Sequence, residues 1–308
     1  MEKRADAVLP ERTREYRNHM LDSTNWDKVI PRDDDIIINT CYKSGTTWMG
    51  QIVNELVWQG RESEKPKGAG GLDAWIDFSR IPEESLDHLN NLPHRRVLKS
   101  HLPLDGLRFF PQCKYLYVAR GGLDVVTSWW SFYKSFTGIL PVVNDAPDLH
   151  GPKLPEPPED FHQFYRDWIS KGWFDWEGDG YPFWSYTHHA ATWWPYRHLP
   201  NVMFLHYNEL KEDLPGMMRK IAKFLDIAIV EDKWEETVHH CTFDYMKEHA
   251  DNSSPMFNKL FKEGGAAVIH KGTNNRWKGV MSTEEIQQYH DRMEAALPME
   301  CAKWLNRD

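Results

Sequence analysis

An α/β fold, with a mostly parallel central sheet flanked by helices on both faces, is predicted by two features of the sequence. Short apolar runs rich in β-branched residues precede longer stretches in which apolar residues recur every three or four positions. This succession repeats along the chain, and parallel strands need crossover connections of this helical kind. The 308 residues lie near the upper limit of one hydrophobic core. We therefore expect a single domain across residues 1–308, with an N-terminal extension at residues 1–30.

The first strand is predicted at residues 36–40, whose sequence IIINT is short and apolar at its centre, as in a strand buried on both faces. A helix follows this strand, because Trp48, Ile52 and Leu56 recur at a spacing of four residues. The helix is expected to end near Gly60. Polar and small residues fill the junction between the strand and the helix.

The remaining elements follow the same pattern. Apolar runs begin the stretches RRVLKSHLPL at residues 95–104, KYLYVARGGLDVVTSWWSFY at 114–133 and NVMFLHYNELKEDLPGMMRKIAKFL at 201–225, and in the last two a helix follows the strand. A final amphipathic helix is predicted at residues 283–297. Six prolines lie between residues 138 and 160, which predicts a long loop or lid rather than regular structure.

Composition argues against several classes of protein. No apolar stretch approaches the ~18 residues of a membrane-spanning helix, and the charged N-terminal stretch has no apolar block after it, unlike a secretory signal. Four scattered cysteines fit neither a disulfide framework nor a zinc site. We therefore expect a cytoplasmic protein. The net charge of −9 argues against nucleic acid as a partner, so any anionic ligand must be bound locally.

Aromatic residues are unusually frequent, with 15 Trp, 14 Phe and 12 Tyr, and many cluster at residues 161–196. Most of them are expected in the hydrophobic core. A few are expected to line a pocket. We place a cleft for an apolar ligand at this aromatic segment, with the proline-rich loop at residues 138–160 as its lid.

The junction after the first strand brings together a lysine, a glycine and hydroxyl side chains at residues 43–47. A helix N-terminus presents unpaired N–H groups and the positive end of the helix dipole, which favours phosphate or sulfate. A threonine helix cap beside a solvated lysine is the structural alternative. A Walker A loop carries its lysine after its second glycine, whereas Lys43 precedes Gly45, so an ATP or GTP site fits poorly.

The stretch YKSGTTW at residues 42–48 resembles the 5′-phosphosulfate loop of the cytosolic sulfotransferases. These enzymes transfer a sulfuryl group from 3′-phosphoadenosine 5′-phosphosulfate, leaving 3′-phosphoadenosine 5′-phosphate (PAP), to an alcohol, phenol or amine. The resemblance implies a P-loop-like sulfotransferase fold with no metal cofactor. Its donor-binding residues here would be Lys43, Ser44, Gly45, Thr46, Thr47 and Trp48. The family usually has proline where Tyr42 stands.

Five further segments resemble the family in order along the chain. LKSHLP resembles the segment of the catalytic histidine, which implies that His101 is the base with Lys99 nearby. YVARGGLDVVTSWWSF resembles the 3′-phosphate segment, which implies Arg120 and Ser128 as phosphate ligands. HYNELKEDL resembles the segment whose tyrosine, here Tyr207, faces the adenine.

Two of these segments lie toward the C-terminus. CTFDYMKE implies that Thr242 and Phe243 approach the nucleotide, and IHKGTNNRWK resembles the Arg-Lys-Gly loop that reaches the 3′-phosphate. That loop would contribute His270, Lys271 and Gly272. The residues themselves agree with two anion sites, because two strand-to-helix junctions carry cations, at Lys43 and at Arg120.

Three further departures from the family pattern bear on the site and on assembly. His270 stands where the family has arginine, so either His270 or the nearby Arg276 replaces that contact. Gly121 and Gly122 occupy positions where the family has bulkier polar residues. The dimer motif of the family would fall on KGVMSTEEIQ, where only Lys278 matches, so a monomer or a different dimer is expected.

The sequence therefore predicts a sulfotransferase acting on a small-molecule acceptor, with an apolar or aromatic alcohol as the leading class. A glycolipid, a sugar or an amine remains open as the acceptor. Two alternatives are a P-loop-like phosphoryl transferase, disfavoured because no strand ending in a Mg²⁺-binding Asp is evident, and a nucleotide-binding module that has lost catalysis.

Overall fold

The computed structural model describes residues 8–64, 75–250, 257–269 and 272–307. Its centre is a four-stranded sheet in the order β2-β1-β3-β4, and all three pairs of neighbouring strands are parallel. The strands are β1 (Ile36–Thr40), β2 (Val97–Ser100), β3 (Lys114–Ala119) and β4 (Val202–His206). This sheet confirms the predicted α/β class, and each strand lies within a segment that the sequence predicted.

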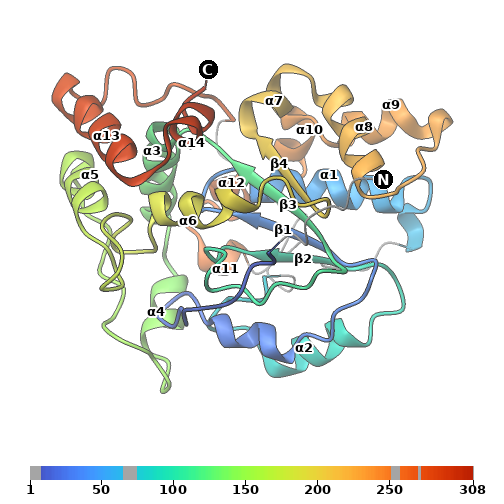
Figure 1. Ribbon diagram of the computed structural model, residues 1–308, viewed down its shortest axis with the longest axis horizontal. Coiled ribbons are helices and arrows are strands. Elements are labelled where there is room, and N and C mark those ends of the chain that lie inside the picture. Colours follow the sequence, from blue (N-terminus) through green and yellow to red (C-terminus); the bar gives the residue numbers. More distant parts are fainter. Residues whose placement is uncertain (1–7, 65–74, 251–256, 270–271, 308) are drawn as a thin grey trace.

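Helices connect the strands and follow the sheet along the chain. In chain order they are η1 (Ser23–Lys28), α1 (Thr46–Trp58), η2 (Glu62–Glu64), α2 (Glu83–Asn90), α3 (Gly122–Tyr133), α4 (Ile139–Asn144), α5 (Phe161–Ser170), α6 (Tyr186–Trp193), η4 (Trp194–Tyr196), α7 (Tyr207–Glu212), α8 (Leu214–Phe224), η5 (Glu231–Lys233), α9 (Trp234–His240), α10 (Phe243–Glu248), α11 (Phe257–Leu260), α12 (Gly265–Val268), α13 (Thr283–Ala296) and α14 (Met299–Leu305). Figure 1 shows α1, α8 and α9 grouped on the right of the sheet and α3, α5 and α13 on its left.

The two faces of the sheet are covered by separate hydrophobic clusters, because successive side chains of a strand point to opposite faces. Ile36 and Ile38 of β1 belong to a cluster with residues of α1 and α8. Ile37 lies in a larger cluster with Tyr115, Tyr117 and residues of α3, α5 and α6. Both faces of the sheet are therefore buried, as parallel strands require.

Aromatic side chains fill much of the larger cluster. Trp168, Trp193 and Tyr165 are fully buried within it. Most of the aromatic segment at residues 161–196 thus belongs to the core, which is the role that the sequence favoured for most of these residues. The last predicted helix is also present as α13, whose Tyr289 and Met293 are buried against the same cluster.

The N-terminal segment from residue 8 to residue 30 packs into the larger cluster. Tyr16, Leu21 and Trp26 are fully buried there, and Leu21 forms a β-bridge with Phe78. The Trp26 indole donates a hydrogen bond to Asp77 at 3.1 Å. This segment is therefore part of the folded core rather than an appendage of it.

The proline-rich segment is partly helical, which differs from the expectation of a loop throughout. Ile139–Asn144 form α4, and Pro141 lies in the first turn of that helix, where an N–H group has no helical partner to lose. The following residues up to Asp160 form a loop. Hydrogen bonds from Trp130 to the Pro158 carbonyl and between Asn144 and Leu154 anchor this loop to the body of the protein.

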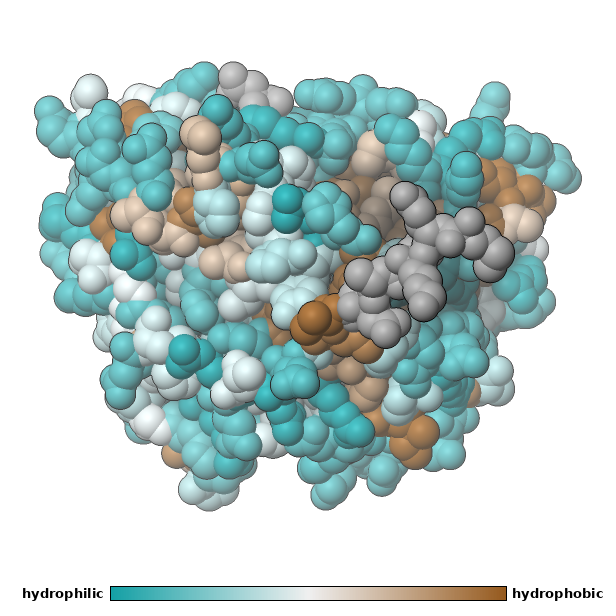
Figure 2. Space-filling view, viewed as in Figure 1, coloured by the Kyte–Doolittle hydropathy of each residue, from teal (hydrophilic) through white to brown (hydrophobic). Residues whose placement is uncertain are grey.

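The viewed surface is mostly hydrophilic, with hydrophobic residues gathered near its middle (Figure 2). Within the described ranges, no helix is both long and apolar enough to cross a membrane. All four cysteines are buried free thiols.

Candidate functional site

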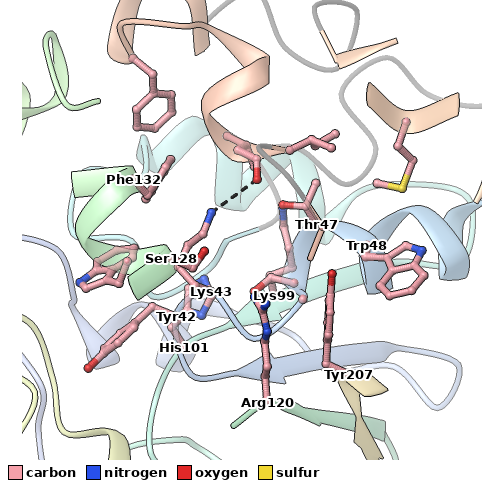
Figure 3. Close-up of a pocket in the computed structure, with 18 of the residues that line it drawn as sticks. Tyr42, Lys43, Thr47, Trp48, Lys99, His101, Arg120, Ser128, Phe132 and Tyr207 are labelled. Atoms are coloured by element: carbon pink, nitrogen blue, oxygen red, sulfur yellow. Dashed lines mark hydrogen bonds between the residues drawn. The ribbon is translucent and has the colours of Figure 1, made fainter. Parts of the chain in front are cut away.

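Each of the four parallel strands delivers a predicted site residue just beyond its C-terminal end. Lys43 follows β1, His101 follows β2, Arg120 follows β3 and Tyr207 follows β4. All four residues line one pocket of about 260 Å³ (Figure 3). The carboxyl ends of parallel strands meet at one edge of a sheet, so four residues far apart in the sequence come together there.

Most of the predicted site residues lie in this pocket. Those that line it are Lys43, Gly45, Thr46, Thr47, Trp48, Lys99, His101, Arg120, Ser128, Tyr207, Phe243 and Gly272. Two others are not part of its wall: the Ser44 side chain is fully buried, and Thr242 is the N-cap of α10, where its hydroxyl accepts from the Tyr245 backbone N–H. His270 and Lys271 lie outside the described residues.

Lys43 lies deep in the pocket among other cations. Its Nζ is 3.4 Å from the carbonyl oxygen of Val268 and 4.2 Å from the centre of the Phe132 ring (Figure 3). Burial, together with the positive charges of Arg120 and Arg276, lowers the pKa of Lys43 to about 7. A buried ammonium between two guanidinium groups is electrostatically unfavourable until an anion joins them.

Arg120, just before α3, and Ser128, within it, form a second candidate anion-binding region of the pocket. The Arg120 guanidinium donates to the Thr273 carbonyl at 3.0 Å and to the Asn274 side chain at 3.1 Å, and it lies over the Tyr207 ring. Its Nε is buried and has no hydrogen-bond acceptor among the described residues. Such a donor fits a bound anion.

The loop before α1 can approach a ligand closely because of Gly45. This residue has φ of 111°, a conformation that glycine adopts without strain, and no side chain caps the helix that begins after it. A Cβ atom here would lie 3.0 Å from the Tyr207 ring. Tyr207 in turn packs edge-on against Trp48, with ring centres 5.2 Å apart. These rings form an aromatic end of the pocket beside the uncapped helix N-terminus.

His101 has a hydrogen-bond pattern that exposes one ring nitrogen for chemistry. Its Nδ1 lies 2.7 Å from the carbonyl oxygen of Thr40, an acceptor only, so Nδ1 carries the proton and donates it. The neutral ring then presents Nε2 as a lone-pair acceptor. The side chain remains partly accessible from the pocket. This arrangement is the one that a general base requires.

Four influences set the basicity of His101. Burial lowers its pKa, and the nearby charge of Lys99 lowers it as well, whereas the carboxylate of Asp77 and the hydrogen bond to Thr40 raise it. The ring is therefore neutral near pH 7 and can accept a proton. Trp75 packs edge-on against it, with ring centres 4.9 Å apart.

An apolar wall adjoins His101. Its side chains come from several elements: Met20, Tyr42, Trp75, Trp129, Phe132, Phe136, Ile139, Trp184, Phe261, Val268 and Ile269. From the aromatic segment expected to form the acceptor cleft, only Trp184 lines the pocket, and from the proline-rich segment only Ile139 does. The sequence did not predict that Trp129 and Phe132 of α3 and Phe136 just after it would line the pocket, whereas the aromatic rings of α5 lie in the core.

The pocket is strongly cationic. No aspartate or glutamate occurs among its described lining residues. The lysines and arginines that line it are Lys43, Lys99, Arg120, Lys211 and Arg276. Lys211 lies one helical turn after Tyr207 on α7 and was not predicted; the spacing of four residues is the signal that would have found it. These cations fit a nucleotide with anionic groups at two places. No group of three or more potential metal ligands occurs in the described part of the chain.

A parallel α/β sheet with an uncapped, lysine-bearing junction and a cationic pocket fits a site for an anionic ligand. The family is established by comparison with known proteins. The chain matches the sulfotransferase domain over residues 33–302 and belongs to that family.

Its relatives agree with this assignment. The chain is 28% identical to the glycolipid sulfotransferase of Mycobacterium bovis (strain BCG / Pasteur 1173P2), over 94% of this chain and 93% of the relative. It is 29% identical to sulfotransferase 1A1 of Rattus norvegicus, over 83% and 82% of the two chains. The protein is a sulfotransferase enzyme.

Solved structures share its fold. Mouse sulfotransferase SULT7A1 complexed with PAP superimposes with a TM-score of 0.65, at 20% identity and over 91% of each chain. Retinol dehydratase in complex with androsterone and inactive cofactor PAP gives a TM-score of 0.66, at 20% identity, over 90% of this chain and 84% of the other.

Proposed function

We propose that this sulfotransferase moves a sulfuryl group from 3′-phosphoadenosine 5′-phosphosulfate to a hydroxyl of an apolar or aromatic small molecule. The observation that carries the proposal is that His101 shares one pocket with an apolar wall and with a group of cations. Its ring lies 4.9 Å from the Trp75 ring and 5.8 Å from the Trp184 ring, and Lys43 and Lys99 line the same pocket. An acceptor hydroxyl and an anionic donor would meet at this point.

The residues divide the chemistry between them. The acceptor oxygen attacks sulfur and forms the new O–S bond, while the bond between sulfur and the 5′-phosphate oxygen breaks. His101 takes the hydroxyl proton at Nε2. Lys43 neutralises the charge that develops on the departing phosphate oxygen. Gly45 lets the loop backbone approach the 5′ end of the donor, and Tyr207 and Trp48 offer rings to its adenine.

The 3′-phosphate is assigned to Arg120 and Ser128, with Arg276 as the replacement for the arginine that the family has at position 270. Support comes from the position of Arg276 in the pocket wall, where its Nη2 donates to Ser131 of α3 at 3.2 Å. Burial lowers the pKa of Arg276, and repulsion from the nearby charge of Arg120 lowers it as well. A phosphate between these side chains would relieve that repulsion.

The acceptor class is inferred from the wall around His101. Apolar and aromatic side chains predominate there, and no carboxylate occurs among the described lining residues to pair with a cationic amine. A neutral alcohol or a phenol therefore fits better than an amine. A glycolipid is the second candidate, because relatives named for that activity match nearly the whole chain. Phosphoryl transfer is disfavoured, since the charged wall offers cations and no acidic ligand for Mg²⁺.

The test uses His101→Ala with two acceptors that differ in acidity, benzyl alcohol and 4-nitrophenol at pH 8. Transfer to benzyl alcohol should fall by roughly 10²- to 10⁴-fold, the usual contribution of a general base. Transfer to the ionised nitrophenol should fall much less, because its oxygen has no proton to lose. PAP should bind the variant as it binds the wild type. If His101→Ala transferred the sulfuryl group to benzyl alcohol at the wild-type rate, His101 would not be the general base.

A further inference from the structure

We infer that Asp77 is a positioning residue for sulfuryl transfer, which fixes His101 and the Trp75 wall beside it and stabilises the imidazolium that His101 becomes. This inference rests on the proposed function. Asp77 is a fully buried carboxylate in the segment that runs beside β2. Neither its sequence position nor the family resemblance singled it out.

Asp77 holds the backbone of His101 in place. The segment from Trp75 to Asp77 adds to the edge of the sheet: Trp75 forms a parallel β-bridge with Lys99, and the Ile76 N–H donates to the Lys99 carbonyl at 3.0 Å. Two residues after Lys99, at His101, the Asp77 carboxylate accepts the hydrogen bond that a strand carbonyl oxygen would otherwise accept. The His101 backbone N–H donates to Asp77 Oδ2 at 2.9 Å. This hydrogen bond fixes the backbone at His101, where the loop after β2 begins.

The same carboxylate fixes the aromatic wall next to the base. The Trp75 indole N–H donates to Asp77 Oδ2 at 2.9 Å, and the Trp26 indole N–H donates to Oδ1 at 3.1 Å. The Trp75 ring in turn packs edge-on against the His101 ring and lines the pocket. Two sides of the base, its backbone and its neighbouring ring, thus depend on one carboxylate.

A charged group buried at this place is costly unless its partners compensate for it. Three N–H donors surround the carboxylate, and the positive charge that forms when His101 takes a proton adds to that of Lys99 nearby. The other ionisable groups that act on or with this ring are Lys99 of β2 and His189 of α6, and neither contributes a negative charge. Asp77 is therefore the negative charge that favours proton transfer to His101, and its effect is largest when the imidazolium forms.

The test is Asp77→Asn, which keeps the volume and removes the charge, assayed with the acceptors used for His101. Transfer to benzyl alcohol should fall on the order of 10²-fold, because a misplaced catalytic group costs about this much. Transfer to 4-nitrophenol should fall far less. In the pH profile of kcat/KM for benzyl alcohol, the acid limb should move to lower pH, since the pKa of His101 falls when the carboxylate is lost.

Trp26→Phe is the matched control, because it removes a donor from Asp77 without touching His101 or the pocket wall. This variant should keep the wild-type preference between the two acceptors. Equal losses on both acceptors in Asp77→Asn, or wild-type activity on both, would overturn the assignment. The rise in unfolding temperature on adding PAP shows whether the variant is folded. If Asp77→Asn does not fold, Trp75→Phe replaces it, and a loss confined to benzyl alcohol is then required.

Failure of this inference is distinct from failure of the proposed function. If the wild type transfers no sulfuryl group to either acceptor, the proposed function fails. If the wild type and His101→Ala behave as described above while Asp77→Asn matches the wild type, only the role of Asp77 fails.

Discussion

At the scale of single residues, the pocket strongly changes the chemistry of Lys43. The pKa of this lysine is lowered from 10.5 to about 7 by burial and by two neighbouring arginines. Near neutral pH the lysine is therefore poised between its charged and neutral forms before the donor binds. An anion in the pocket favours the charged form, so ligand binding and proton uptake are linked.

This linkage predicts that PAP affinity falls as pH rises from 7.5 to 9. Above its pKa Lys43 is neutral in the free protein and must gain a proton to pair with phosphate. The PAP affinity should therefore fall by up to about tenfold per pH unit. The phosphate itself is already fully ionised in this range. Calorimetric titrations in two buffers of different ionisation enthalpy should show proton uptake in the wild type. A wild-type profile as flat as that of Lys43→Met would contradict the linkage.

The two arginines of the anion region give a second prediction. Arg120→Ala and Arg276→Ala should each weaken PAP by roughly tenfold or more, because each charge-assisted hydrogen bond contributes about 1.5–3 kcal/mol. Adenosine 5′-phosphosulfate, which has no 3′-phosphate, should bind both variants almost as it binds the wild type. Competition binding with the two nucleotides measures the difference. Parallel losses for both ligands would place these arginines elsewhere on the nucleotide.

At the scale of elements, the junction of β1 and α1 depends on a glycine in an unusual conformation. Gly45 has φ of 111° and lies against the Tyr207 ring, whereas Gly50 lies within α1, and a Cβ atom there would meet no atom within 4 Å. The two glycines therefore form a matched pair within a few residues of each other.

We predict opposite outcomes for alanine at these two positions. Gly45→Ala should destabilise the protein by at least about 1–2 kcal/mol, the cost of a left-handed conformation for an L-residue, and should weaken PAP. Gly50→Ala should stabilise it by roughly 0.4–1 kcal/mol and leave PAP binding unchanged. Urea unfolding measures both. Equal stability of the two variants would show that the junction carries no conformational constraint.

The elements also show what the sequence could and could not predict. The strands and α1, α3 and α13 were predictable because their apolar periodicity reflects burial on particular faces. The strand-end residues of the site followed from the rule for parallel sheets and from the family resemblance. The edge segment at Trp75 was not predictable, because its pairing with Lys99 depends on contacts distant in the sequence. The part that α3 takes in the pocket wall was not predictable for the same reason, since periodicity does not say which helix faces a pocket.

At the scale of the whole molecule, the N-terminal segment and the sheet share one hydrophobic cluster. Trp26, 51 residues before its hydrogen-bond partner Asp77, is fully buried in that cluster. The segment should therefore unfold together with the rest of the protein rather than detach first.

Trp26→Ala tests this prediction. It should cost about 3–5 kcal/mol, as expected for truncating a buried tryptophan, and should lower the midpoint of one cooperative transition. Trp176→Ala, at a partly exposed position, should cost less. Circular dichroism in the far and near ultraviolet should give coincident thermal curves. A separate early transition, with the main midpoint unchanged, would show that the segment is a detachable extension.

The four buried thiols bear on how this protein could be followed in solution. Cys41, Cys113 and Cys301 lie in the larger cluster and Cys241 lies in the cluster on the opposite face of the sheet. Burial raises the pKa of Cys113 and Cys301 to about 12, so the reactive thiolate is scarce while the chain is folded. The rate at which a maleimide alkylates each thiol then measures how fast that thiol becomes exposed to solvent. Because the thiols are divided between the two faces, mass spectrometry of the labelled peptides would report which side of the sheet opens first.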